Sequence, residues 1–114
     1  MPTPTFRRWD VVAVPFPYTE GDQAARRPTV VVSGDKLAQQ HGLYWVVMIT
    51  SAVNPSWPDD VRVSESGRAG LPVPSVVRPA KIATIQHDRI IRRLGALPAA
   101  DRATVQAALR RHLG

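Results

Sequence analysis

Short runs of apolar, mostly β-branched residues alternate with connections rich in proline and glycine along most of this 114-residue chain. Valine and isoleucine suit the pleated surface of a strand, whereas glycine and proline mark turns. The runs that predict strands are 9–16, 27–33, 44–50, 61–63, 75–85 and a last strand within 90–97. Short strands separated by such turns are typical of a small antiparallel barrel or curved sheet.

Two segments have helical rather than strand-like spacing. Asp35 is expected to cap a short helix over 36–40 that Gly42 ends. Residues 98–112 are expected to form a terminal helix, because proline is tolerated in the first turn and apolar residues then recur at roughly helical intervals. The predicted class is therefore mainly β (α+β), with helices on one side of the sheet.

Two arginines stand directly before the proline that opens the second predicted strand. Proline has no backbone N–H and is accepted at the first residue of a strand. Arg27 therefore lies where a connection enters a rigid strand, which would hold its guanidinium in one direction. Thr50 and Ser51 form the polar end of the third strand. If these two strands are antiparallel, the arginine and the threonine hydroxyl can meet over one cleft.

Further polar and aromatic candidates surround the loops after these strands. Pro79 interrupts the 75–85 strand, and a bulge there would aim Arg78 and Lys81 out of the sheet. The 52–60 loop carries Trp57 between prolines. Each candidate also has an ordinary explanation: an arginine at a strand edge shields that edge, and a loop tryptophan can cover the core.

Charge and composition restrict the classes of function that the chain can have. The net charge is +6, and 13 of the 15 cationic residues are arginine, whose planar fork matches phosphate oxygens. This excess of arginine indicates a polyanion or an acidic protein as partner, although a GC-rich genome also favours arginine over lysine.

The chain lacks cysteine, which excludes a thiolate nucleophile and cysteine-ligated zinc and fits a cytoplasmic location. The three histidines are far apart, so we expect no metal or other cofactor.

The length predicts one domain over 1–114, with a flexible lead-in over 1–8. No apolar stretch approaches the roughly 18–20 residues that span a bilayer, so no membrane association is expected.

The order of several segments resembles that of a known family, the MazF/PemK toxins. The matching segments are 9–16, 27–33, 49–51, 70–71, 75–78 and 93–97, so the resemblance runs from about Trp9 to the C-terminus.

The resemblance implies an SH3-like barrel of curved antiparallel strands with short helices and a C-terminal helix, assembled as a homodimer. It also implies the toxin of a type II toxin–antitoxin pair. Most such toxins are metal-independent endoribonucleases that cut single-stranded RNA, usually mRNA, and leave a 2′,3′-cyclic phosphate and a 5′-hydroxyl. An acidic cognate antitoxin covers their RNA groove.

By the same resemblance, the catalytic arginine before proline corresponds to Arg27 and the catalytic threonine to Thr50. The acidic residue of the first long loop corresponds best to Asp22, with Glu20 nearby. Some PemK-like members carry an Arg-x-Asp pair at the second bend, but this chain has Ala80 where the aspartate would be. The identity of the general base is therefore open between Asp22, Glu20 and a positioned water.

These assignments match the chemistry that RNA cleavage needs. Arg27 and Arg78 would stabilise the charge of the transition state, since a guanidinium is a strong hydrogen-bond donor and a poor proton acceptor. RNA contacts are assigned to Arg26, Ser51, Lys81 and Glu20, and bases are expected to stack on Trp57 or Tyr18. Two alternatives remain: a CcdB-like poison of DNA gyrase and a catalytically inactive RNA-binding module.

Overall fold

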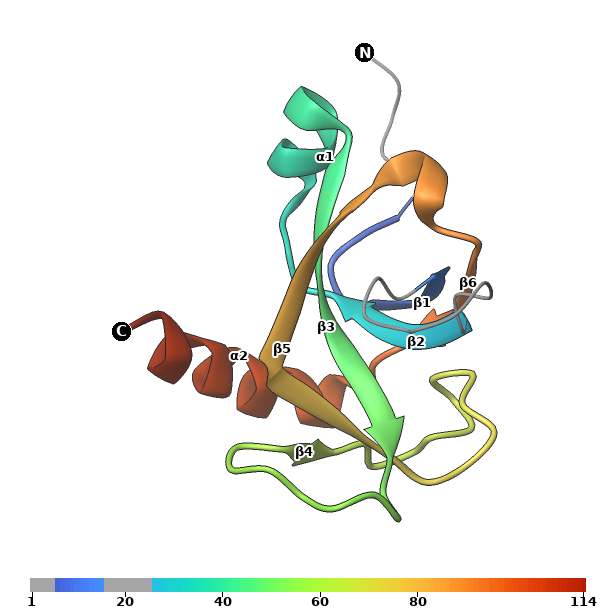
Figure 1. Cartoon of the computed structure of the whole chain (residues 1–114), viewed down its shortest axis with the longest axis vertical. Coiled ribbons are helices and arrows are strands. Elements are labelled where there is room, and N and C mark those ends of the chain that lie inside the picture. Colours follow the sequence, from blue (N-terminus) through green and yellow to red (C-terminus); the bar gives the residue numbers. More distant parts are fainter. Residues whose placement is uncertain (1–5, 16–25) are drawn as a thin grey trace.

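Antiparallel strands form one strongly curved sheet in the computed structural model, which describes residues 6–15 and 26–114. Its strand order is β4-β5-β3-β2-β1-β6 (Figure 1). The strands are β1 (Asp10–Pro15), β2 (Arg26–Val31), β3 (Leu43–Ser51), β4 (Val61–Arg62), β5 (Ser75–Gln86) and β6 (Arg92–Ala96). The sheet curls into a half-barrel with a helix at the C-terminal end, which confirms the predicted mainly-β class.

The two longest strands, β3 and β5, form the spine of this sheet and bend together. The register between them runs from Leu43↔Gln86 to Val47↔Ile82 and resumes at Met48↔Arg78. Residues 79–81 are therefore extra on β5, and Figure 1 shows the strand turning sharply about halfway along. Proline cannot donate to the ladder, so the bulge falls at Pro79, as the sequence predicts.

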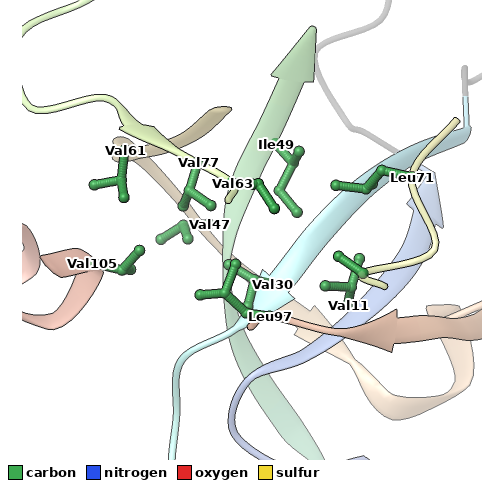
Figure 2. Packing of buried hydrophobic residues seen from close by; sticks show 11 residues of the cluster. Val11, Val30, Val47, Ile49, Val61, Val63, Leu71, Val77, Leu97 and Val105 are labelled. Carbon is green, nitrogen blue, oxygen red and sulfur yellow. The ribbon is translucent and has the colours of Figure 1, made fainter. Parts of the chain in front are cut away.

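Both faces of the sheet are covered, which explains why apolar residues follow one another directly in β1 and β2. One face carries Val11, Val30, Val47 and Val77, and it packs against Val105 of the C-terminal helix; Figure 2 shows this cluster. The opposite face carries a second cluster that includes Val12, Val14, Val31, Val46 and Tyr44. Alternate residues of each strand thus belong to different cores, since side chains alternate across a sheet.

The helices agree with their predicted positions but not with every predicted cap. Helix α1 spans Asp35–His41, and its N-cap is Gly34. Asp35 was expected to be the cap, but it lies in the first turn, where its negative charge still interacts favourably with the helix dipole. Gly42 ends the helix in the left-handed conformation, with φ of 64°, which confirms the predicted stop. A 3₁₀ turn, η1, spans His87–Arg89 between β5 and β6.

The terminal helix α2 spans Ala99–Leu113, and Pro98 is its N-cap rather than part of the first turn. Asp101 in that first turn accepts hydrogen bonds from the backbone N–H and the hydroxyl of Ser64, at 2.9 and 3.0 Å. These bonds attach the start of α2 to the segment after β4. A bilayer could not be crossed by any helix in the described part of the chain, since the longest of them has 15 residues.

The segment that leads into β1 makes a specific contact. Phe6 is buried, and its ring meets those of Tyr44 and His87 at centroid distances of 5.8 and 5.7 Å. The described end of the lead-in, for which we predicted flexibility, therefore packs against one face of the sheet.

Two glycines allow the loop before β5 to pack directly on β6. A Cβ atom at Gly95 would lie 2.6 Å from the carbonyl carbon of Ala69, and one at Gly70 would collide with the backbone of Leu94. Gly70 also has a φ of 76°, which L-residues rarely adopt. The contact between residues 68–70 and 94–95 thus depends on the absence of two side chains.

We expect Gly95→Ala to lower the free energy of unfolding by about 1–3 kcal/mol, because the added methyl would push two backbone segments apart. Urea denaturation at neutral pH measures the change. Gly67→Ala is the matched control, since a Cβ at that position meets nothing within 4 Å. Equal stability of the two variants would contradict the close packing.

Candidate active site

Arg27 stands at the open start of β2. The β2–β3 ladder ends at the pair Thr29↔Met48, so residues 26–28 pair with β1 alone, with Arg27 opposite Val14. Its side chain is exposed, and it makes no ion pair with another described residue. As far as the described residues show, this guanidinium can donate hydrogen bonds to an anion.

Thr50 lies on the same side of the sheet as Arg27. Continuing the β2–β3 register by two residues would set Arg27 opposite Thr50, and residues opposite each other in a ladder share a face. Beyond Thr29 the strands diverge, as Figures 1 and 2 show from different directions. The predicted antiparallel arrangement of the two strands is confirmed, while their meeting over one cleft stays a prediction.

The Thr50 hydroxyl takes part in a hydrogen bond that fixes the following loop. Its Oγ1 accepts a bond of 2.7 Å from the side-chain amide of Asn54, which leaves the hydroxyl proton available to another acceptor. The neighbouring Ser51 is half-buried at the end of β3, opposite Ser75 of β5. Both hydroxyls thus lie where the sequence predicts, at the polar end of the strand.

Arg78 is not directed out of the sheet, and that expectation was wrong. Its Nε and Nη2 donate to the two carboxylate oxygens of Asp60 at 3.1 and 3.0 Å, and Nη2 also donates to the carbonyl of Pro55 at 2.8 Å. The side chains of this ion pair are only 8% and 7% exposed. The reason is register: Val61 of β4 pairs with Val77, so the preceding Asp60 comes beside Arg78. A buried charge requires a partner, and here it has one.

Trp57 lies against this ion pair and stays accessible. The Cζ atom of Arg78 is 4.4 Å from the centroid of the indole, and Nζ of Lys81 is 5.0 Å from it. Cation–π contacts at such distances hold an aromatic ring in place. Trp57 is 40% exposed and belongs to neither core cluster, which argues against the alternative that it covers the core. The structure therefore gathers three of the predicted site residues: Trp57, Arg78 and Lys81.

Asp60 is the residue of this group that sequence reasoning missed. Burial would raise the pKa of its carboxyl, but hydrogen bonds from Arg78 and from the Trp57 amide, together with the charge of Arg78, bring the pKa below its ordinary value. The only feature of the sequence that pointed to Asp60 is its position in a pair of carboxylates, Asp59 and Asp60, directly before a predicted strand. The sequence did not indicate which strand would lie beside this pair.

The adjacent Asp59 fastens the same loop to a different element. Its carboxylate accepts a bond of 2.7 Å from Arg111 of α2 and lies 3.5 Å from the imidazole of His112. Asp59 adopts a φ of 68°, which turns the two neighbouring carboxylates in different directions. Together with the Asn54–Thr50 bond, these contacts attach the 52–60 loop at three points: to β3, to β5 and to α2.

Three predicted site residues, Tyr18, Glu20 and Asp22, lie outside the described residues, so their roles stay predictions. Within the ranges that the structure describes, no group of three histidine, aspartate or glutamate side chains could hold a metal ion. The described candidates for chemistry are therefore arginines, a lysine, hydroxyls and one exposed indole.

Fold and site together define a class: a small curled β-sheet protein with arginines and a threonine at the open end of its sheet, suited to a phosphate-bearing ligand. Comparison with known proteins identifies the family of the chain. The sequence profile of the PemK-like, MazF-like toxins of type II toxin–antitoxin systems matches residues 7–113. The chain therefore belongs to this toxin family.

Individual relatives agree with the family assignment. The chain is 31% identical over 113 residues to Endoribonuclease MazF9 of Mycobacterium tuberculosis, covering 94% of this chain and 95% of the relative. Its fold matches that of MazF from Deinococcus radiodurans with a TM-score of 0.74 and 25% identity, covering 100% and 99% of the two chains. A mycobacterial endoribonuclease in complex with its cognate antitoxin matches with a TM-score of 0.77 and 21% identity, covering 96% of each chain.

We expect Asp60→Asn to lower the free energy of unfolding by about 3–5 kcal/mol at pH 7, because the amide leaves the buried Arg78 without a counter-charge. The pKa of Asp60 is lower in the folded than in the unfolded chain. Its contribution is therefore fully present above the unfolded value of about 3.9 and is lost as the pH falls through the folded value. The difference between wild type and variant should shrink in acid, as measured by urea denaturation over a pH series.

The matched control for this experiment is Glu65→Gln. Glu65 forms an ion pair with Arg68 in which both side chains are mostly exposed, so its loss should cost under about 1 kcal/mol. Equal costs for the two variants, or a cost of Asp60→Asn that does not diminish in acid, would contradict a stabilising buried pair.

Proposed function

We propose that this protein is the toxin of a type II toxin–antitoxin pair and that it cuts single-stranded RNA, usually mRNA. The relative that is 31% identical over nearly the whole chain is an endoribonuclease. The structural observation that carries the proposal is Arg27, an exposed arginine without an ion-pair partner among the described residues, on the face of the sheet that also carries Thr50.

In the proposed reaction the 2′-hydroxyl of the RNA attacks the adjacent phosphorus. The new bond joins the 2′-oxygen to phosphorus, and the bond from phosphorus to the 5′-oxygen breaks, which leaves a 2′,3′-cyclic phosphate and a 5′-hydroxyl. A base takes the 2′-hydroxyl proton, and an acid supplies one to the leaving oxygen. Arg27 would donate hydrogen bonds to the nonbridging oxygens, where charge accumulates in the transition state. Thr50 would orient the phosphate or the leaving oxygen.

Asp60 is a poor candidate for the base, although it pairs with Arg78 next to the bend at which the family's aspartate is replaced by Ala80. Both of its oxygens accept hydrogen bonds, its side chain is 7% exposed, and its pKa is lowered. A general base needs a free oxygen within reach of the proton. The proposal therefore keeps Asp22, Glu20 and a positioned water as candidates, and it requires no metal or other cofactor.

Arg78 receives a different role from the one that the sequence suggested. Its donors to Asp60 and Pro55 fix the 52–60 loop, and Arg27 is left as the main charge-stabilising group. The loop in turn presents the exposed ring of Trp57, on which an unpaired base can stack. Arg26, Ser51 and Lys81 are assigned to contacts with the RNA strand.

The proposed partners follow from the same activity. A net charge of +6 suits both an RNA strand and an acidic antitoxin, whose carboxylates would occupy positions that RNA phosphates occupy. We further propose a homodimer that acts in the cytoplasm, where mRNA is translated.

Arg27→Ala should reduce the rate of RNA cleavage by at least about 10²–10³-fold, because it removes donors aimed at transition-state charge. End-sequencing of RNA incubated with the purified protein and EDTA detects new 5′-hydroxyl ends and excludes a metal-dependent contaminant. Arg110→Ala, an exposed change on α2 that removes the same charge, should cleave at the wild-type rate. Undiminished cleavage by Arg27→Ala would refute the assignment.

A wild-type protein that protects RNA without producing new ends would instead indicate an inactive RNA-binding module. Inhibition of DNA supercoiling without RNA cleavage would indicate a gyrase poison. Both outcomes would refute the proposed nuclease.

Thr50→Val tests the hydroxyl while keeping the shape of the side chain. We expect kcat to fall by roughly 10–100-fold, because an oriented donor at the reacting phosphate is lost. Thr50→Ser retains the hydroxyl and should keep most of the activity. Circular dichroism melting curves measure whether loss of the bond to Asn54 alters folding. Equal kcat values for the valine and serine variants would contradict a role for the hydroxyl.

A further inference from the structure

A pocket of about 440 Å³ lies beside Arg27 and is lined by two further arginines, Arg26 and Arg92. We propose that this pocket holds one nucleotide of the RNA strand, with a phosphate on Arg26 and Arg92 and the base against an apolar wall of Leu71, Pro72 and Ile91. The inference rests on the proposed RNA substrate. It adds a binding subsite and a residue, Arg92, that neither the sequence pattern nor the resemblance indicated.

The pocket is a consequence of strand pairing around one small residue. Ala13 of β1 is flanked by Pro28 of β2 on one side and by Arg92 of β6 on the other. Residues in such a row point to the same face, and Arg26, two positions before Pro28, belongs to that face as well. The short side chain of Ala13 leaves a hollow between the longer side chains beside it.

Alternation also separates this pocket from the proposed site of cleavage. Arg27 is offset by one residue from Arg26 and Pro28, so it belongs to the face of Thr29 and, by register, of Thr50. Thr50 is not among the residues that line the pocket. Arg27 nevertheless contributes to the lining of the pocket, so one RNA strand bound at Arg27 would have a neighbouring nucleotide at the pocket.

One part of the apolar wall, Leu71, is fixed by the core before any ligand arrives. Leu71 is 5% exposed and belongs to the core cluster around Val11 and Val30. The loop that carries it is held against β6 by the close approach of Gly70 and Gly95 to the opposite backbone. A preformed wall lowers the entropy cost of binding.

The charged residues that line the pocket are all arginines within the described part of the chain. Arg26 and Arg92 are exposed and form no ion pair with another described residue, whereas the adjacent Arg93 pairs with Asp10 at 3.0 Å. Unneutralised guanidinium groups at one opening favour an anion, and phosphate accepts two of their hydrogen bonds at once.

The pairing of cations with an apolar wall favours a nucleotide over a bare phosphate, because a phosphate alone would leave the wall unused. The volume lies within the range of about 300–1,000 Å³ of pockets that take small organic groups. Proteins that bind single-stranded RNA typically contact unstacked bases with side chains while cations follow the backbone.

The test measures binding of the full chain to a random-sequence 2′-O-methyl RNA of roughly 12 nucleotides, which cannot be cleaved. Arg92→Gln should raise Kd roughly tenfold and reduce the slope of log Kd against log salt by about 0.7, the value for one phosphate contact in a single strand. Arg110→Gln, which removes an equal charge on α2, should change Kd less than about twofold. Ile91→Ala should raise Kd about threefold without altering the salt slope.

Equal effects of Arg92→Gln and Arg110→Gln would show that charge acts only at long range, and would overturn the subsite. An unchanged Kd for Ile91→Ala would overturn the base-binding wall. Weaker binding of a poly-glutamate peptide to Arg92→Gln, with RNA binding unaffected, would overturn the proposal in favour of an acidic protein segment. Because the RNA cannot be cut, the binding results test the subsite independently of whether the wild-type protein has nuclease activity.

Discussion

The pairing of β3 along both of its edges determines where Arg27, Thr50 and Arg78 lie. On one edge its register with β2 sets Arg27 toward the end of β3 that carries Thr50. On the other edge its register with β5 is interrupted at Pro79, which sets Arg78 opposite Met48. A shift of one residue on either edge would move these side chains to the opposite face. Strand register is therefore the constraint on which the proposed chemistry depends.

Ion pairing then divides the arginines into two functional groups. Arg78, Arg93 and Arg111 each have a carboxylate partner, and Arg78 is buried with it. Such arginines hold loops and strands together. Arg27 and Arg92 have no such partner among the described residues and are exposed beside a pocket. An arginine whose charge is already matched has little to gain from a phosphate, so the unmatched arginines that line the pocket are the better candidates for RNA contacts.

The 52–60 loop shows how a segment without regular structure becomes a defined surface. Asn54, Asp59 and Asp60 attach it to three different elements, and the Trp57 ring is held against two cations. Loops fixed in this way can present an aromatic ring at low entropic cost on binding.

The sequence by itself determined most of the strands, both helices, the bend at Pro79 and the candidate pair of Arg27 and Thr50. These features are local: they follow from β-branched runs, from proline and glycine, and from motif order. The bond between Asp60 and Arg78 and the pocket around Ala13 were decided only by tertiary structure. Each joins residues that are separated in the sequence, and the register that brings them together is set by packing of the whole sheet rather than by local pattern.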